Sequence, residues 1–288
     1  MARFPVIDLT SLDAPEIIET LDYEDILQAL KDDTDTRFNE LGLTFDVADL
    51  ESDPAVKLLE VAADREVRLR ARVNGACKAL LLTYEQGADL DNLASWFQVE
   101  RMTGETDGRL RYRTQLAPQA FSSAGPRGSY EFWTLNTDVN IKHVGITTPL
   151  DGYVNVYPLM DSGNGAPSQS VINAVLTTLS ASDIGLVTDA LSVEAPVIIN
   201  QDIEIKLLVE RGPDAATVVT AAETAIQSYA DSRHRVGYVL RTSGICAAAQ
   251  VAGVESMTLV KPTADVDPGE RGAIYVSSIT ITTETYGG

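Results

Sequence analysis

The residues best suited to acid–base chemistry are the two histidines, His143 and His234, because histidine exchanges its proton near neutral pH. Asp231 and Ser232 precede His234, which suggests a hydrolytic triad in which the histidine would activate the serine hydroxyl. Such a triad requires convergence in space, and spacing along the chain does not show it. His234 stands where a predicted helix ends, a position that favours a hydrogen-bonding or cationic side chain. We therefore expect a structural role for His234 and keep a hydrolase as the remote alternative.

Three further polar clusters could hold a ligand, but each has a simpler interpretation. The loop 161–165 could surround a phosphate before a helix, yet it lacks the lysine of a phosphate-binding loop. The acidic segment 264–270, ADVDPGE, departs from the spacing of a calcium loop, and Pro268-Gly269 predicts a turn there. The basic cluster 109–113, RLRYR, is interpreted as a salt-bridging surface. The sequence therefore predicts no catalytic residue, no metal site and no cofactor.

Charge narrows the classes of partner. The formal net charge is −20, and residues 1–54 hold 15 acidic and 3 basic side chains. A field of this sign repels phosphate, which argues against nucleic acid and anionic membranes as partners. A basic partner for the acidic segment stays open beside the simpler interpretation of a solvated face. Cys77 and Cys246 are expected as buried thiols, and the absence of a long apolar run predicts a soluble protein without a secretion signal.

The periodicity of apolar residues predicts an α+β protein, with a helical N-terminal region followed by two small mixed or antiparallel α+β units. The predicted divisions are an extended arm at 1–14, a helical region at 15–136, and α+β domains at 137–195 and 196–288. Within the helical region we expect a helix from Pro15 to Leu41 and a short helix capped by Asp89. Strand patterns begin at Val139, and Gly212-Pro213 precedes a further long helix.

The clearest pattern is a long helix at 52–83, where Asp53 and Pro54 are typical of an N-cap and a first helical residue. Two apolar stripes follow it. One contains Ala55, Leu58, Ala62, Leu69, Val73, Ala76 and Leu80, and the adjacent one contains Val56, Leu59, Ala63 and Val67. Acid–base pairs four residues apart, Asp53/Lys57, Asp64/Arg68 and Glu66/Arg70, support the outer face.

We predict that Val56, Leu59, Ala63 and Val67 form part of an intersubunit helical bundle. An internal core made by the same stripe is an equally strong alternative.

Five ordered blocks of the chain resemble the baseplate assembly protein J family of contractile-tail phages. The long helix has the order S-x-P-x-x-K-L-L-E, then A-x-R-E, then R-x-R-V-N-x-A, and GADLDNLA is similar to the next turn and helix. The other blocks are QAFSSAGPRGSYEFW, LSVEAPVIINQDIEIKLLVERGPDAATV, and the segment from YADSRHRVG to KPTADV. Together the blocks span nearly the whole chain.

The resemblance implies a structural wedge subunit of a phage tail baseplate and not an enzyme. It implies association with a second copy, a smaller baseplate wedge protein and neighbouring wedges, together with contacts to hub and sheath-initiator proteins. It also implies that the ring of wedges couples baseplate rearrangement to sheath contraction. The protein would be made in the host cytoplasm and reside in the virion baseplate. The same pattern occurs in headless, tail-like bacteriocins, which are the close alternative particle.

Overall fold

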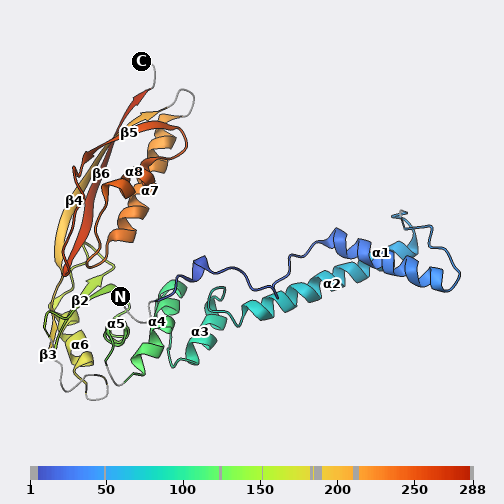
Figure 1. Cartoon of the computed structure of the whole chain (residues 1–288), viewed down its shortest axis with the longest axis horizontal. Coiled ribbons are helices and arrows are strands. Elements are labelled where there is room, and N and C mark those ends of the chain that lie inside the picture. The colour runs from blue at the N-terminus through green and yellow to red at the C-terminus, as the bar shows by residue number, and fades with distance from the viewer. Residues whose placement is uncertain are drawn as a thin grey trace. The chain divides into compact units, whose positions relative to one another are not determined.

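Figure 1 shows the computed structural model, which describes residues 6–48, 50–122, 125–150, 152–181, 184, 190–209 and 214–285. Residues 1–5 of the predicted arm and the predicted Gly212-Pro213 break lie outside the described residues. Contacts divide the chain into two compact units. We call residues 5–100 with 107–111 the helical unit, and residues 101–106 with the chain from 112 onward the mixed unit. The domain boundaries expected from the sequence stay predictions.

The helical unit is built around two helices that lie side by side (Figure 1). Its elements are the 3-10 helix η1 (Leu9–Ser11), α1 (Tyr23–Glu40), α2 (Pro54–Lys78), α3 (Gly87–Ser95) and the first turn of α4 (Asp107–Ala120). The expected start of α1 at Pro15 was wrong. The helix begins at Tyr23 because the Asp22 carboxylate accepts hydrogen bonds from the backbone N–H groups of Glu24 and Asp25.

The N-caps of the next two helices agree only in part with those predicted from the sequence. Asp53 accepts a hydrogen bond from the N–H of Ala55, and a proline opens α2, which confirms the predicted start. The expected Asp53/Lys57 pair was wrong, because that carboxylate caps the helix and Lys57 pairs with Glu60 at 2.8 Å. Asp89 does not cap α3 either. It lies in the first turn, and the helix begins at Gly87.

The mixed unit begins with the rest of α4 and contains two three-stranded sheets. The first sheet combines β1 (Ile141–Thr147), β2 (Tyr153–Met160) and β3 (Ala190–Val193) in that order, with α5 (Arg127–Leu135) and α6 (Gln169–Leu179) beside it. β1 runs antiparallel to β2, and β2 runs parallel to β3. The parallel pair requires a crossover, and α6 lies in that connection.

The second sheet has the order β5-β4-β6, formed by β4 (Val197–Val209), β5 (Val254–Lys261) and β6 (Gly272–Thr285). Its central strand is antiparallel to β5 and parallel to β6. Alternate residues Ile203, Ile205, Leu207 and Val209 are buried against α7 (Ala215–Arg233) and α8 (Thr242–Ala249) (Figure 1). Period-two burial on the strand meets a four-residue period on α7, so the expected α+β class with mixed sheets is confirmed.

Candidate assembly surfaces

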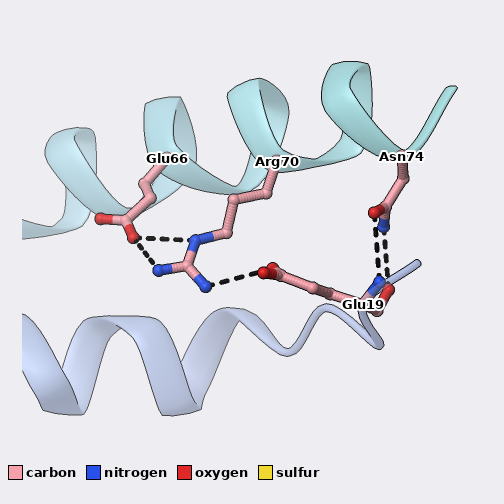
Figure 2. Close-up of polar contacts among 4 residues, drawn as sticks. All are labelled: Glu19, Glu66, Arg70 and Asn74. Atoms are coloured by element: carbon pink, nitrogen blue, oxygen red, sulfur yellow. Dashed lines mark hydrogen bonds and ion pairs between the residues drawn. The ribbon is translucent and has the colours of Figure 1, made fainter. Parts of the chain in front are cut away.

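A polar clasp fixes the segment that leads into α1 against the C-terminal half of α2 (Figure 2). The side-chain amide of Asn74 forms two hydrogen bonds with the backbone of Glu19: its oxygen accepts from the N–H at 3.1 Å, and its nitrogen donates to the carbonyl at 2.8 Å. Arg70 joins the Glu19 carboxylate at 3.2 Å and the Glu66 carboxylate at 2.6 Å. These contacts occupy the Glu19 backbone, which gives a second reason why α1 does not extend back to Pro15.

The four residues predicted as an intersubunit interface lie on the same stripe of α2 as this clasp. Val56 is 1% exposed and Ala63 is fully buried, whereas Leu59 and Val67 are half-buried. The spacing from Ala63 through Val67 to the clasp residues keeps one helical face, and α1 packs on α2. Burial within one chain is the arrangement that the internal-core alternative describes. An intersubunit role for these four residues stays a prediction.

The described residues of this chain leave the other stripe of α2 uncovered. Its large apolar side chains are between 56% and 71% exposed, and they are Leu58, Val61, Leu69 and Val73. At 3.6 residues per turn they point to a different side of the helix from Val56 and Ala63. We call these four residues the open face of α2. The sequence marked both stripes, although it did not mark Val61, and which stripe α1 covers depends on tertiary packing that periodicity does not encode.

His234 caps the C-terminus of α7, as expected. It is buried, and its Nδ1 donates a hydrogen bond to the carbonyl oxygen of Ile274 at 2.7 Å. Its Nε2 faces Gly165, where an added Cβ would come within 2.7 Å of that nitrogen. Both ring nitrogens therefore face protein groups, and the histidine joins α7 to β6.

The other members of the hypothetical triad are directed elsewhere. The Ser232 hydroxyl donates to the carbonyl oxygen of Tyr229 at 2.6 Å, within its own helix. The Asp231 carboxylate accepts from the side chain of Gln227 at 2.9 Å. The described contacts thus use each polar group in helix capping or surface hydrogen bonding, and they do not bring serine, aspartate and histidine together.

His143 lies on β1, as the strand pattern predicts, and its Nδ1 accepts a hydrogen bond from the N–H of Val236 at 3.2 Å. Burial, reinforced by the positive charges of Arg235, Arg127 and Lys142, lowers the pKa of His143 to about 4. The neutral ring is therefore the form that accepts this bond at neutral pH. It also packs edge-on against the ring of Tyr238.

The polar groups in the two loops considered as ligand sites form hydrogen bonds with other groups of the protein. In the loop 161–165, the N–H of Gly165 donates to the Ser162 carbonyl, and the N–H of Met160 donates to the Gly165 carbonyl. Asp265 accepts three hydrogen bonds from Thr242 and Arg241, which fasten the start of α8. Asp267 accepts from the N–H of Gly269, in the predicted turn. In the described part of the chain, no group of three or more His, Cys, Asp or Glu residues is arranged to hold a metal ion.

The basic cluster 109–113 does not form the surface expected of it. Arg113 pairs with Glu105 at 2.8 Å, and the two side chains are 3% and 0% exposed. Its guanidinium also donates to the side chain of Asn136. Arg111 donates to backbone carbonyls in the segment before α3, and Tyr112 donates to Glu131. The alternation of arginines along α4 was visible in the sequence, but the buried acid that pairs with Arg113 lies outside the cluster.

Comparisons with known proteins agree along most of the chain. Residues 51–106 match the Baseplate J-like N-terminal domain, residues 122–199 the Baseplate J-like central domain, and residues 201–282 the Baseplate J-like protein C-terminal domain. The chain is 30% identical over 296 residues to "Baseplate protein J" of Escherichia phage P2, which covers 97% of this chain and 98% of that protein.

Among solved structures, one chain of the anti-feeding prophage (AFP) baseplate, a 6-fold symmetrised cryo-EM structure, superposes with a TM-score of 0.42 at 15% identity. The match covers 63% of this chain and 43% of that chain, so the present chain spans less than half of its length. None of the helices in the described ranges combines the length and apolar character needed to cross a bilayer.

Proposed function

The chain belongs to the Baseplate J-like family of phage tail baseplate proteins, and we propose that it acts as a structural wedge subunit of that assembly. In this role it binds a second copy of itself and a smaller wedge protein, and it contacts neighbouring wedges, hub and sheath-initiator proteins. The ring of wedges then transmits baseplate rearrangement to the contracting sheath. A headless, tail-like particle would use the chain in the same way.

The observation that carries the proposal is the open face of α2. A helix that leaves four large apolar side chains in water while its other stripe is covered has the pattern of a helix in a bundle with a missing member. The bundle predicted around Val56, Leu59, Ala63 and Val67 would then use both stripes of α2, with a different helix packed on each. In our proposal, α1 covers that stripe in the free chain, and a helix of the smaller wedge protein packs on the open face.

The acidic surface of the N-terminal segment supports the choice of partner. Exposed carboxylates cluster on α1, including Glu24, Asp25, Asp32 and Asp33. A partner helix with basic residues beside its apolar stripe would complement both the open face of α2 and the carboxylates of α1. Like charge disfavours association, whereas opposite charge accelerates it. We therefore expect the helix that covers the open face to carry lysine or arginine beside its apolar stripe.

Co-expression with the neighbouring tail gene products tests the role directly. Size-exclusion chromatography with light scattering is expected to give a complex of two copies of this chain with one smaller partner. A monodisperse monomer that binds none of the tail proteins would overturn the wedge proposal.

A pair of matched substitutions tests the surface. Leu69→Asp is expected to weaken the complex strongly, because it places a carboxylate within the apolar contact. Leu150→Asp is the control: it makes the same chemical change at a side chain that is 68% exposed, against 65% for Leu69, but in the turn before β2. If both variants lose the complex equally, or if neither variant loses it, the open face is not the contact.

A further inference from the structure

β1 forms an unpaired edge of the first sheet. In the described part of the chain it pairs with β2 alone, and the strand order places its other side at the rim of the sheet. Residues 144–148 contain neither a charged residue nor a proline, which commonly protect such an edge from adding a further strand. The opposite edge is β3, whose four residues limit pairing by their short length.

Pro158 shows which backbone groups of β1 point to this edge. It pairs with Val144 but has no N–H to donate, so the two residues form a pair of the ladder without mutual hydrogen bonds. Because the two kinds of pair alternate, Gly145 exchanges its hydrogen bonds with Tyr157. Val144 and Ile146 therefore direct their N–H and C=O groups away from β2. The described residues offer these groups no hydrogen-bond partner.

A pocket of about 380 Å³ borders the end of this strand. Its lining includes residues 145–148, Arg127 at the start of α5, and Tyr238 and Glu270 from the connections that follow α7 and β5. Among the described residues, Arg127 and Glu270 have no ion-pair partner, and the Tyr238 hydroxyl has no hydrogen bond. Unused polar side chains thus lie beside unused backbone groups.

The segment 236–238 is held against β1 by close contacts. The N–H of Val236 donates to Nδ1 of His143 at 3.2 Å, and the Tyr238 ring lies 5.7 Å from the His143 ring between centroids. A Cβ added at Gly145 would come within 2.3 Å of the Val236 side chain, so glycine is what lets the two segments approach this closely. The pocket is therefore formed before a ligand binds, which lowers the cost of ordering it.

The charge around this edge is positive, although the whole chain carries −20. Burial, together with the positive charges of Arg235, Arg127 and Lys142, lowers the pKa of His143. A ligand carboxylate would be attracted to this field, and the Arg127 guanidinium can bind both oxygens of one carboxylate. Glu270 in the same lining disfavours a ligand that carries several acids. The site therefore suits a ligand with a single acidic group.

We propose that the free edge of β1 binds an extended segment of a different protein, which adds a fourth strand to the first sheet and places an aspartate or glutamate on Arg127. Val144 and Ile146 supply main-chain hydrogen bonds, and the pocket accepts alternate side chains of the segment. A small anion leaves those backbone groups unpaired, so it explains less of the edge. A second copy of β1 does not fit either, because residues 141–148 contain no acid to offer Arg127.

Panning of a random peptide library against the full chain tests the site without assuming the identity of the partner. Enriched peptides are expected to combine one acidic residue with β-branched residues at alternate positions. Fluorescence polarisation should show that Arg127→Glu weakens their binding by at least about tenfold. This variant should fold, because residue 127 is exposed and a carboxylate suits the first turn of a helix. Lys206→Glu, the same charge reversal at an exposed position of β4, is the control and should bind as the wild type does.

Methylation of the peptide amides tests whether the ligand adds as a strand. Every second N–H of an added strand faces β1, so methylating that set should abolish binding, whereas methylating the other set should not. The proposal would be overturned if no peptide were enriched, if Arg127→Glu bound as the wild type does, or if both sets of methyl groups had equal effects. Binding of N-acetylglutamate amide as tightly as the peptides would also overturn it, because the pocket would then hold only a small anion. The site does not involve α2, and these outcomes are independent of the wedge role.

Discussion

α2 and β4 use apolar residues in opposite ways. α2 has 25 residues, of which only Val56 and Ala63 are buried, and it leaves its other apolar stripe in water. β4 has 13 residues and buries every second side chain from Ile203 to Val209 beneath α7 and α8. The mixed unit therefore contains the core that stabilises it. The helical unit leaves apolar side chains of α2 exposed, and for this reason we propose α2 as the element that another chain covers.

The polar contacts differ in the same direction. The mixed unit encloses the Arg113–Glu105 ion pair and a neutral His143. The ion pairs of the α1–α2 hairpin, such as Arg68–Asp64, are exposed. Exposed pairs contribute little to stability, whereas breaking a buried pair leaves an uncompensated charge in the interior. Substitutions should therefore affect the two units very unequally.

The largest effect is expected for Glu105→Ala. It leaves the buried Arg113 guanidinium without its carboxylate, which should lower the free energy of unfolding of the mixed unit by about 3–5 kcal/mol. The two tryptophans, Trp96 and Trp133, lie in different units, so a Trp96→Phe background lets denaturant titration follow the mixed unit alone. Arg68→Ala is the control in the helical unit and should leave the curve unchanged. If Glu105→Ala and Arg68→Ala changed the curve equally, the buried and exposed ion pairs would not differ in their contribution to stability.

Two leucine truncations compare the cores directly. Leu207→Ala removes a side chain that is 1% exposed and should cost about 2–5 kcal/mol through lost burial and the cavity left behind. Leu69→Ala removes one from the open face and should change stability by less than about 0.5 kcal/mol while weakening the wedge complex. Denaturation of the isolated chain and binding to the smaller partner are the two measurements. A large stability loss in Leu69→Ala would mean that this stripe already packs within the chain.

Acid should weaken the mixed unit through His143. Its pKa is about 4 in the folded chain against 6.5 for the ordinary side chain, so the unfolded state takes up the proton first as pH falls. The free energy of unfolding should therefore decrease from about pH 6.5 toward pH 4, by up to about 1.4 kcal/mol per pH unit from this group.

The comparison variant is His143→Gln, which keeps an acceptor for the N–H of Val236 but does not titrate. Glu131 acts in the opposite direction, because burial raises its pKa and the folded state gains a proton as pH falls. The difference between wild type and His143→Gln isolates the histidine. Parallel pH profiles for the two proteins would contradict the assignment.

Sequence periodicity was sufficient to predict the fold class, but it was not sufficient to predict which surfaces of the helices are covered. The Asp53-Pro54 start of α2 and the strand patterns are local signals, because capping and period-two alternation act within a few residues. The buried Arg113–Glu105 pair, the start of α1 at Tyr23 and the choice between the two stripes of α2 depend on contacts between distant segments. Asn74 shows the limit well: nothing in its neighbourhood indicates that it binds the backbone of a residue 55 positions earlier.

A small effect is expected for Asn74→Ala, which tests whether the hairpin is held by specific contacts or only by its single apolar face. The substitution removes two hydrogen bonds to the Glu19 backbone, which together should stabilise the clasp by about 1 kcal/mol. Hydrogen exchange at the Glu19 amide should accelerate by about fivefold. Gln28→Ala, which removes a hydrogen bond within α1 alone, should leave that amide unchanged. If Asn74→Ala also leaves it unchanged, the apolar stripe alone positions the segment before α1, and the helical unit relies on packing more than its exposed polar contacts imply.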